Sequence, residues 1–269
     1  MSIRKLIRKK TNYIFNKFID SFFNYIEYSN WYKKLFGFNY FNHRMIIEQK
    51  IYSQNGEDGI IQSLLNMIGV RNKFYVEFGV SDGKECNTRF LREQMNFDGI
   101  AWDGRHEIHD FKLFKEFITA ENINDLFDKY KIPNEFDLLS IDIDYNDLWV
   151  WKSLDEKYKP SIVVIEYNCG FPPPLSLTVP YDATAHWDGH TNFMGASLSA
   201  LNKLALDKKY TLVYCDNRGV NAFFVHNDLL NKITFKIDPV KKIYKKGRYG
   251  IGPFGGHRPH SSDKKMIEY

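Results

Sequence analysis

From residue 74 onward, short apolar runs rich in β-branched and aromatic residues alternate with segments of helical pattern, and few folds accommodate that alternation. Between the runs lie segments such as "KECNTRFLREQ" and "INDLFDKYK", which are long enough to form a helical crossover. The alternation predicts a parallel, doubly wound α/β sheet. The runs that we predict to be its first five strands are 74–79, 99–104, 116–121, 136–144 and 161–168.

After the fifth predicted strand the alternation of strand-like and helical segments stops. Residues 169–192 contain four prolines and no regular period, and so long an irregular loop in a compact domain is usually functional. A helical segment follows, and then two strands, 210–216 and 221–227, which only "NRGV" separates. So short a connection predicts an antiparallel hairpin. The sequence therefore predicts a Rossmann-like, seven-stranded, mostly parallel sheet with a terminal antiparallel hairpin.

The two ends of the chain differ from this central domain, which we place at residues 51–237. Residues 1–50 form a basic, aromatic arm whose apolar residues recur at helical spacing, so we predict a helical N-terminal extension. Its amphipathic pattern suits packing on its own domain, a homodimer contact, or a peripheral membrane contact. Residues 238–269 are basic and Gly-rich, which favours a flexible or partner-ordered tail, with folding back over the site as the alternative.

Composition excludes several classes of protein. The 269 residues are 43% hydrophobic, enough for a sizeable core, and the net charge of +4 is too small to indicate a nucleic-acid partner. The three cysteines are far apart and form no CxxC pair, which argues against a zinc or disulfide framework and fits a reducing compartment. We therefore expect a cytoplasmic protein, peripheral to the inner membrane surface if the arm contacts lipid.

The first strand leads into the turn "VEFGVSDGKECNT", where a ligand of such a sheet binds. Gly79 and Gly83 let the backbone approach a ligand, but neither G-x-G-x-x-G nor the phosphate loop G-x-x-x-x-G-K-[ST] is present. Glu77 would repel a pyrophosphate and attract an ammonium group. Asp103 ends the second strand, where a carboxylate typically accepts hydrogen bonds from ribose. These residues suit a cationic nucleoside, and S-adenosylmethionine is such a ligand.

Successive segments of the chain resemble those of a known family. "FYVEFGVSDGKECNT", "GIAWDG", "FDLLSIDIDYND" and "IVVIEYN" resemble the motifs of class I S-adenosylmethionine-dependent methyltransferases, and "YSQNGEDGII" resembles the segment ahead of the first strand in FkbM-like members. The likeness covers about residues 52–227. It implies O-methylation of a sugar hydroxyl, on a nucleotide-activated sugar or in a bacterial surface polysaccharide. The chain departs from the family where "IDIDYND" replaces "K-I-D-V-E-G".

The resemblance also implies roles for individual residues. Asp103 would hold the ribose, Glu121 the adenine, and the "SQNGED" segment would close over the cofactor. An alternative for that segment is a helix cap, in which Ser53 or Asn55 caps a helix over 57–67. The implied cofactor-binding residues are Gln54, Asp58, Glu77, Gly79, Asp82, Gly83, Asp103, Glu121 and Asp142.

Carboxylates gather at two neighbouring strand ends. Asp142 and Asp144 end the fourth predicted strand, and Glu166 and Asn168 end the fifth, so their oxygens should meet at one edge. Together they form a hard ligand set for Mg²⁺ or Mn²⁺, similar to that of cation-dependent O-methyltransferases. In the alternative, Asp142 contacts the methionine moiety, Asp144 binds substrate hydroxyls and Asp147 caps the next helix.

The irregular loop offers candidates for the chemistry and for the acceptor. A sugar hydroxyl needs a route for its proton, so we propose Asp144 and His190 as catalytic residues, with His186 a second loop histidine. Cys169 has no evident base partner and is expected to be structural. An aromatic face beside hydrogen-bond acceptors suits a carbohydrate. The predicted substrate-binding residues are Asn168, Tyr181, Asp182, Trp187 and Asp188.

Two other functions compete with the sugar O-methyltransferase. One is a methyltransferase that acts on a small non-sugar metabolite. The other is a non-catalytic, membrane-associated assembly protein, which the basic aromatic arm favours. Glycine and acidic residues at successive strand ends argue against the second.

Overall fold

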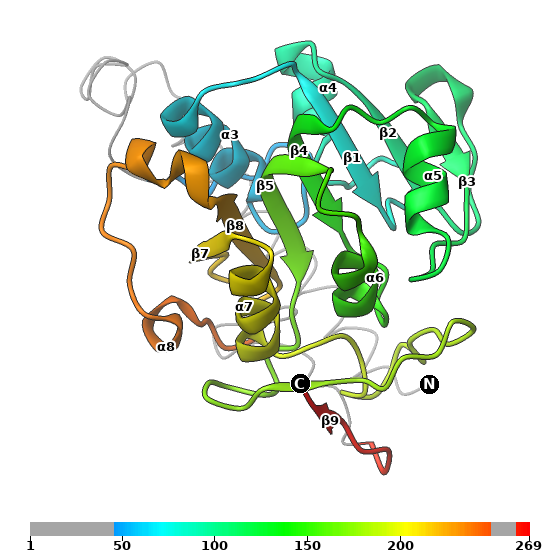
Figure 1. The fold of residues 1–269 in the computed structure, drawn as a ribbon, viewed down its shortest axis with the longest axis vertical. Helices are drawn as coiled ribbons and strands as arrows, with labels where there is room; N and C mark the ends of the chain where they lie inside the picture. The colour runs from blue at the N-terminus through cyan, green and yellow to red at the C-terminus, as the bar shows by residue number, and fades with distance from the viewer. Residues whose placement is uncertain (1–45, 249–261) are drawn as a thin grey trace, which may run out of the picture.

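The computed structural model describes residues 46–248 and 262–269, and the N-terminal arm with its predicted helix lies outside them. Seven strands form one sheet in the order β3-β2-β1-β4-β5-β8-β7, in which β8 alone runs antiparallel to its neighbours. The carboxyl ends of the parallel strands point toward the bottom of Figure 1. The strand bounds are β1 Phe74–Phe78, β2 Asp98–Asp103, β3 Leu113–Lys115, β4 Glu135–Ile141, β5 Lys159–Glu166, β7 Tyr210–Cys215 and β8 Asn221–His226.

Helices cover both faces of the sheet (Figure 1). On one face α5 (Ile123–Lys129), α6 (Asp147–Ser153) and α7 (Leu198–Asp207) pack on the sheet, together with the short α8 (Val240–Ile243). The other face is covered by α3 (Glu57–Ile68), α4 (Arg89–Met95) and the 3₁₀ helix η2 (Asn227–Lys232). Because both faces are covered, the centre of β5 is a continuous apolar run from Ile162 to Ile165 with no solvent exposure. The α/β class, the mostly parallel sheet and the terminal hairpin are confirmed.

The prediction for the third strand was wrong. The strand is β3, Leu113–Lys115, and residues 116–121 form a loop and turn beyond it. Pairing explains the difference: β2 ends at Asp103, which lies opposite Lys115, so no partner continues alongside residues 116–121. A short 3₁₀ helix, η1 (His109–Phe111), occupies the connection ahead of β3.

The described parts of the basic C-terminal segment pack on the domain. Ile243 in α8 joins the core, and residues 244–248 lie against the turn between β7 and β8. At the end of the chain, β9 (Ile267–Glu268) pairs antiparallel with β6 (Leu177–Thr178) of the irregular loop. For these residues the alternative prediction, a tail that folds back, is the one the structure shows.

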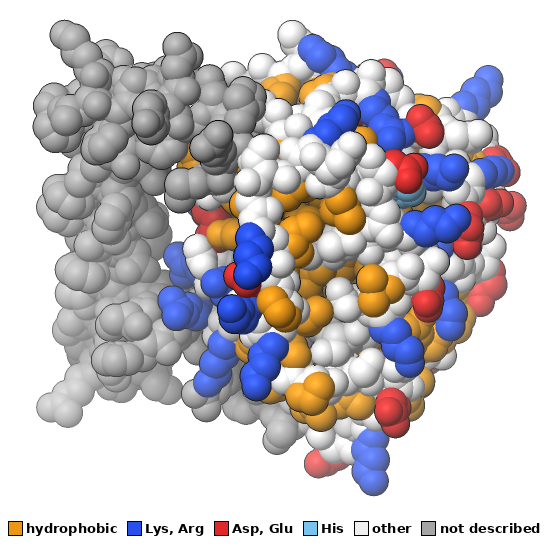
Figure 2. Space-filling view, turned by 60° about the vertical axis from the view of Figure 1, so that its left-hand side comes forward, with side chains coloured by type: hydrophobic (Ala, Val, Ile, Leu, Met, Phe, Trp, Pro, Cys, Tyr) orange, Lys and Arg blue, Asp and Glu red, His pale blue; other side chains and the backbone are white. Residues whose placement is uncertain are grey.

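Figure 2 shows the side of the molecule that is on the left in Figure 1. Apolar side chains are visible in the middle of this face, with Lys and Arg side chains around them. Beyond η2, the partly buried Phe235 and Ile237 pack against the core on the α3 side of the sheet. Within the described residues, no helix has the length and the hydrophobicity that crossing a membrane requires.

Candidate functional site

A cavity of about 1560 Å³ opens at the carboxyl edge of the sheet. It lies over β1 and β4, where the chain order reverses, which is the usual ligand position in an open α/β sheet. Its volume exceeds the roughly 300–1,000 Å³ of a pocket for one small ligand. The cavity therefore has room for two ligands, such as a cofactor and a substrate.

The turn after β1 is shaped by a glycine at the cavity wall. Gly79 has a φ of +72°, and a Cβ atom on it would lie 1.5 Å from the carbonyl oxygen of Asp142. No side chain fits there, so only glycine lets this turn pack against the end of β4. Gly83, at a φ of +69°, instead packs on the ring of Phe111, and it does not line the cavity.

Asp103, at the end of β2, lines the cavity and organises two turns. Its carboxylate accepts hydrogen bonds from the backbone of Ser81 (2.9 Å), Arg105 (2.8 Å) and His106 (3.0 Å). Burial works against the charged form, but these bonds and the His106 side chain outweigh it and hold the pKa of Asp103 below its usual value. Asp103 therefore stays a carboxylate that can accept further hydrogen bonds.

Glu77 and Asp82 do not line the cavity. Glu77 is buried and accepts hydrogen bonds from the backbone of Asn87 (2.8 Å) and from the backbone (3.1 Å) and hydroxyl of Thr88. It therefore anchors the start of α4 from inside the protein. Asp82 pairs with Lys84 at the surface, at 2.6 Å.

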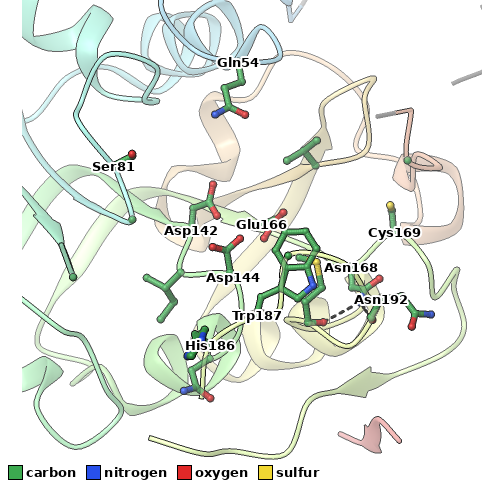
Figure 3. Close-up of a pocket in the computed structure, with 18 of the residues that line it drawn as sticks. Gln54, Ser81, Asp142, Asp144, Glu166, Asn168, Cys169, His186, Trp187 and Asn192 are labelled. Carbon is green, nitrogen blue, oxygen red and sulfur yellow. Dashed lines mark hydrogen bonds between the residues drawn. The ribbon is translucent and has the colours of Figure 1, made fainter. Parts of the chain in front are cut away.

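Three carboxylates meet at the floor of the cavity. Asp142, Asp144 and Glu166 each place an oxygen within 4.8 Å of the other two, and Figure 3 shows their side chains converging. Asp144 adopts a φ of +65°, a conformation that is uncommon outside glycine and is found at functional sites. Oε2 of Glu166 has no hydrogen-bond partner among the described residues. The cluster thus offers several carboxylate oxygens, one of them without a hydrogen-bond partner, as ligands for a divalent cation.

The electrostatics of the cluster favour a positive ligand. Two effects raise the pKa of Asp142 well above its usual value. The larger is its removal from bulk water, and the second is repulsion from the negative charge of Asp144. Burial and then the charge of Asp142 do the same to the pKa of Glu166. Asp144 is the most exposed of the three, yet its partial removal from water also raises its pKa, which the charge of Arg105 opposes. A cation bound here would relieve the repulsion and return all three groups to the ionised form.

Asn168 and Asp147, the other polar residues of these two strand ends, have structural contacts. The amide nitrogen of Asn168 donates to the carbonyls of Asn192 and Met194 (both 2.9 Å), and its oxygen accepts from Gly170 (3.0 Å). It lines the cavity, but it holds the loop rather than joining the carboxylates. Asp147 is the first residue of α6, and its Oδ1 accepts from the backbone of Ile143 (2.8 Å) instead of capping the helix.

Of the cofactor-binding residues predicted in the segment ahead of α3, one lines the cavity. Gln54 lines it and extends toward the carboxylates from the opposite side (Figure 3). Asp58 is buried away from the cavity, where its Oδ2 accepts from the backbone of residues 51–53. The N-cap residue of α3 is Gly56 and no side chain caps it, so the alternative of Ser53 or Asn55 as the cap was wrong. Ser53 Oγ instead accepts from the backbone N–H of Asp58, inside the first turn, at 3.1 Å.

The irregular loop divides into residues that line the cavity and residues that brace the loop. Trp187, His186 and His190 line it, and Figure 3 draws Trp187 and His186 among the lining residues. Tyr181, Asp182 and Asp188 are not among the lining residues. Asp188 accepts from the backbone of residues 190 and 191, and these bonds lower its pKa to about 2.

Glu121 also lies outside the cavity lining, because the strand that was expected to carry it ends at Lys115. Its carboxylate accepts a hydrogen bond from the hydroxyl of Tyr181. Glu116 and Phe117, which follow β3 directly, line the cavity where Glu121 was expected.

Sequence reasoning missed four basic residues of the cavity wall: Arg105, Arg218, Lys246 and Arg248. Arg105 lies two residues after the end of β2, so its position shortly after a strand could have revealed it. The other three come from the β7–β8 turn and from the C-terminal segment, whose packing no local pattern indicates.

No protein-family model matches the chain, and no curated protein matches it significantly in sequence. The likeness to methyltransferases therefore stays a prediction, and the functional proposal rests on the geometry of the cavity.

Proposed function

We propose that the protein is an S-adenosylmethionine-dependent O-methyltransferase that acts on a hydroxyl group of a sugar, in a cytoplasmic step of surface-polysaccharide synthesis. One observation carries the proposal: a tight glycine turn, a ribose-type carboxylate and a cluster of three carboxylates line one cavity at the switch point of a Rossmann-like sheet. The cavity is also large enough for both a cofactor and an acceptor.

The cofactor is assigned to the part of the cavity over β1 and β2. Asp103 would accept hydrogen bonds from the ribose hydroxyls, and the Gly79 turn would admit the backbone close to the ligand. Gln54 lies above the carboxylates, where its amide can donate to the methionine carboxylate. The nearby negative charges favour the sulfonium and the ammonium group of this ligand over a dinucleotide.

The acceptor is assigned to the part of the cavity between the carboxylates and the irregular loop. Asp142, Asp144 and Glu166 would hold a divalent cation such as Mg²⁺ or Mn²⁺, which supplies Lewis acidity that lowers the pKa of a hydroxyl. Trp187 offers an apolar face for a sugar ring, and Asp144 or His190 accepts the hydroxyl proton. Methyl transfer then needs the hydroxyl in line with the sulfonium, which the shared cavity makes possible.

The proposal is tested by cofactor binding and by cation dependence. S-adenosylmethionine should raise the Tm, and Asp103→Asn should weaken its binding about tenfold by removing a charged acceptor. Asp98→Asn is the matched control, because Asp98 lies at the other end of β2 and pairs with Lys112 at the surface. Mg²⁺ or Mn²⁺ should stabilise the protein and support methyl transfer to a panel of sugars, read by mass.

Asp144→Asn should abolish the stabilisation by the cation, whereas Asp182→Asn, outside the cavity lining, should not. If S-adenosylmethionine gives no shift, the methyltransferase proposal fails, and the non-catalytic assembly protein takes its place. If exhaustive chelation leaves the activity unchanged, the cation is removed from the proposal.

A further inference from the structure

The cavity has a basic wall as well as an acidic floor. Arg218, Lys246 and Arg248 line it from two segments that are far apart in sequence. No carboxylate in residues 46–248 or 262–269 forms an ion pair with any of the three. The acidic floor thus attracts cations, while the wall presents positive charge that no acidic side chain of these segments neutralises.

This basic wall is built into the fold. The backbone N–H of Arg248 donates to the carbonyl of Arg218 at 2.7 Å, which ties the two segments together. A Cβ atom on Gly219 would lie 2.8 Å from the carbonyl oxygen of Lys245, so the segments fit only because residue 219 is glycine. The buried Asp216 accepts from the backbone of Arg218 (2.8 Å) and Val220 (3.0 Å), which fixes the turn that carries the arginine.

Strand β5 links the basic wall to the acidic floor. Glu166, its last residue, belongs to the carboxylate cluster. The next residue, Tyr167, is buried, and its hydroxyl donates to the carbonyl of Lys245 at 2.7 Å and accepts from the backbone of Lys245 at 3.2 Å. The spacing between the acidic and basic regions is therefore held by adjacent residues, the last residue of β5 and the one directly after it.

A ligand that spans both regions needs a polar, cation-tolerant part and an anionic part. Sugar hydroxyls suit the first. Phosphate suits the second, because guanidinium groups bind phosphate oxygens in a bidentate manner and lysine adds a point charge. A neutral glycan would leave the three cations without a counter-charge.

We propose that Arg218, Lys246 and Arg248 bind a phosphate or diphosphate group of the methyl acceptor, so that the substrate class is a phosphorylated or nucleotide-activated sugar and not a neutral polysaccharide. This inference rests on the proposed function, since it names the acceptor of that site. The sugar hydroxyl lies at the carboxylates, and the phosphate lies at the β7–β8 turn, away from the cofactor side of the cavity.

The test compares binding of four probes by isothermal titration calorimetry: inorganic pyrophosphate, a sugar 1-phosphate, a nucleoside diphosphate sugar and a neutral methyl glycoside. The three phosphate-containing probes should bind, and the neutral glycoside should bind at least about tenfold more weakly. Between the sugar 1-phosphate and the nucleoside diphosphate sugar, the tighter one identifies the source of the phosphate. Affinity for the phosphates should fall as salt increases.

Two double variants separate a specific site from general charge. Arg218→Gln with Arg248→Gln should weaken pyrophosphate binding about tenfold or more. Lys236→Gln with Lys241→Gln removes the same net charge from exposed residues that do not line the cavity, and it should leave binding unchanged. All four substituted residues are exposed, so the Tm of both variants should match the wild type.

Binding of S-adenosylmethionine is measured in parallel. If the cofactor binds but the arginine variant retains wild-type pyrophosphate affinity, or both double variants lose affinity equally, the phosphate site is overturned and the proposed function stands. If the neutral glycoside is methylated as efficiently as the nucleoside diphosphate sugar, the assigned substrate class is wrong. Absence of cofactor binding overturns the proposed function itself.

Discussion

At the scale of single residues, a buried carboxyl group outside the cavity lining opposes folding when it is ionised. This residue is Asp147, which is only 1% exposed and whose Oδ2 has no hydrogen-bond partner among the described residues. Burial raises the pKa of Asp147 to about 7, although the backbone N–H of Ile143 donates to it. Keeping a carboxyl group there costs stability wherever it is ionised.

The pH dependence of stability should reveal this cost. A carboxyl whose pKa is higher in the folded state contributes stability that is fully present below its unfolded pKa of 3.8 and is lost as pH rises through about 7. The Asp147→Asn variant lacks this titrating group. Between about pH 5 and pH 8 the free energy of unfolding should therefore fall in both proteins, but by roughly 2 kcal/mol less in the variant than in the wild type. Urea unfolding at several pH values measures the difference, and identical pH profiles would contradict it.

The sequence predicted the members of the carboxylate cluster better than their neighbours. Asp142, Asp144 and Glu166 could be placed together because parallel strand ends meet at one edge of a sheet. The contacts of Asn168 could not be predicted in this way. Its amide binds carbonyls of residues 192 and 194, whose position depends on how the irregular loop packs.

At the scale of elements, the turn between β1 and α4 is constrained by close packing. The carbonyl oxygen of Asp142 occupies the place where a Cβ atom of residue 79 would lie. The shape of this wall of the cavity and the position of the end of β4 therefore depend on each other.

A pair of glycine variants separates that packing from backbone strain. Gly79→Ala should lower the free energy of unfolding by roughly 3 kcal/mol or more, since it adds overpacking to an unfavourable φ. Gly189→Ala has a similar φ of +74° but open space around it, so it should cost only about 1–2 kcal/mol. Chemical unfolding of the two variants compares them, and equal losses would show that strain alone explains the need for glycine.

Strand lengths were harder to predict than strand identities. The run 116–121 has the composition of a strand, yet pairing stops at Lys115 because β2 offers no partner beyond Asp103. Amino-acid composition indicates how readily a segment can form a strand, whereas the residue at which a strand ends depends on how far the neighbouring strand continues. The expected position of Glu121 was wrong for the same reason.

At the scale of the whole molecule, the end of the described chain braces the irregular loop. Tyr269 packs edge-on against Trp149, at 5.9 Å between ring centroids, and Lys152 and Lys203 lie over its ring. Its backbone N–H donates to Ser176 at 3.0 Å, next to the pairing of β9 with β6. Residues about ninety positions apart thus hold one loop in place.

Removing the Tyr269 ring should loosen the loop without unfolding the domain. Tyr269→Ala removes an aromatic contact of about 1 kcal/mol, so amides of residues 176–179 should exchange with deuterium faster while those of β4 and β5 stay protected. Leu175→Ala, at an exposed position of the same loop, is the control and should exchange like the wild type. Hydrogen exchange read by mass spectrometry measures both, and unchanged protection in Tyr269→Ala would exclude this role.

The overall architecture was predictable because it follows from the alternation of elements and from the short β7–β8 connection. The docking of residues 244–248 was not, since it depends on contacts such as that between Tyr167 and Lys245. Long-range packing of an irregular segment leaves no periodic pattern in the sequence.

The reversed direction of β8 brings the turn 216–220 to the same edge of the sheet as the carboxyl ends of β1, β2 and β4. That turn lies two strands away from β4, on the far side of β5. A change in its length or composition can therefore reshape one end of the cavity while the other end keeps its geometry. Such an arrangement is modular: one half of the site can diversify between relatives of this chain while the other is inherited unchanged.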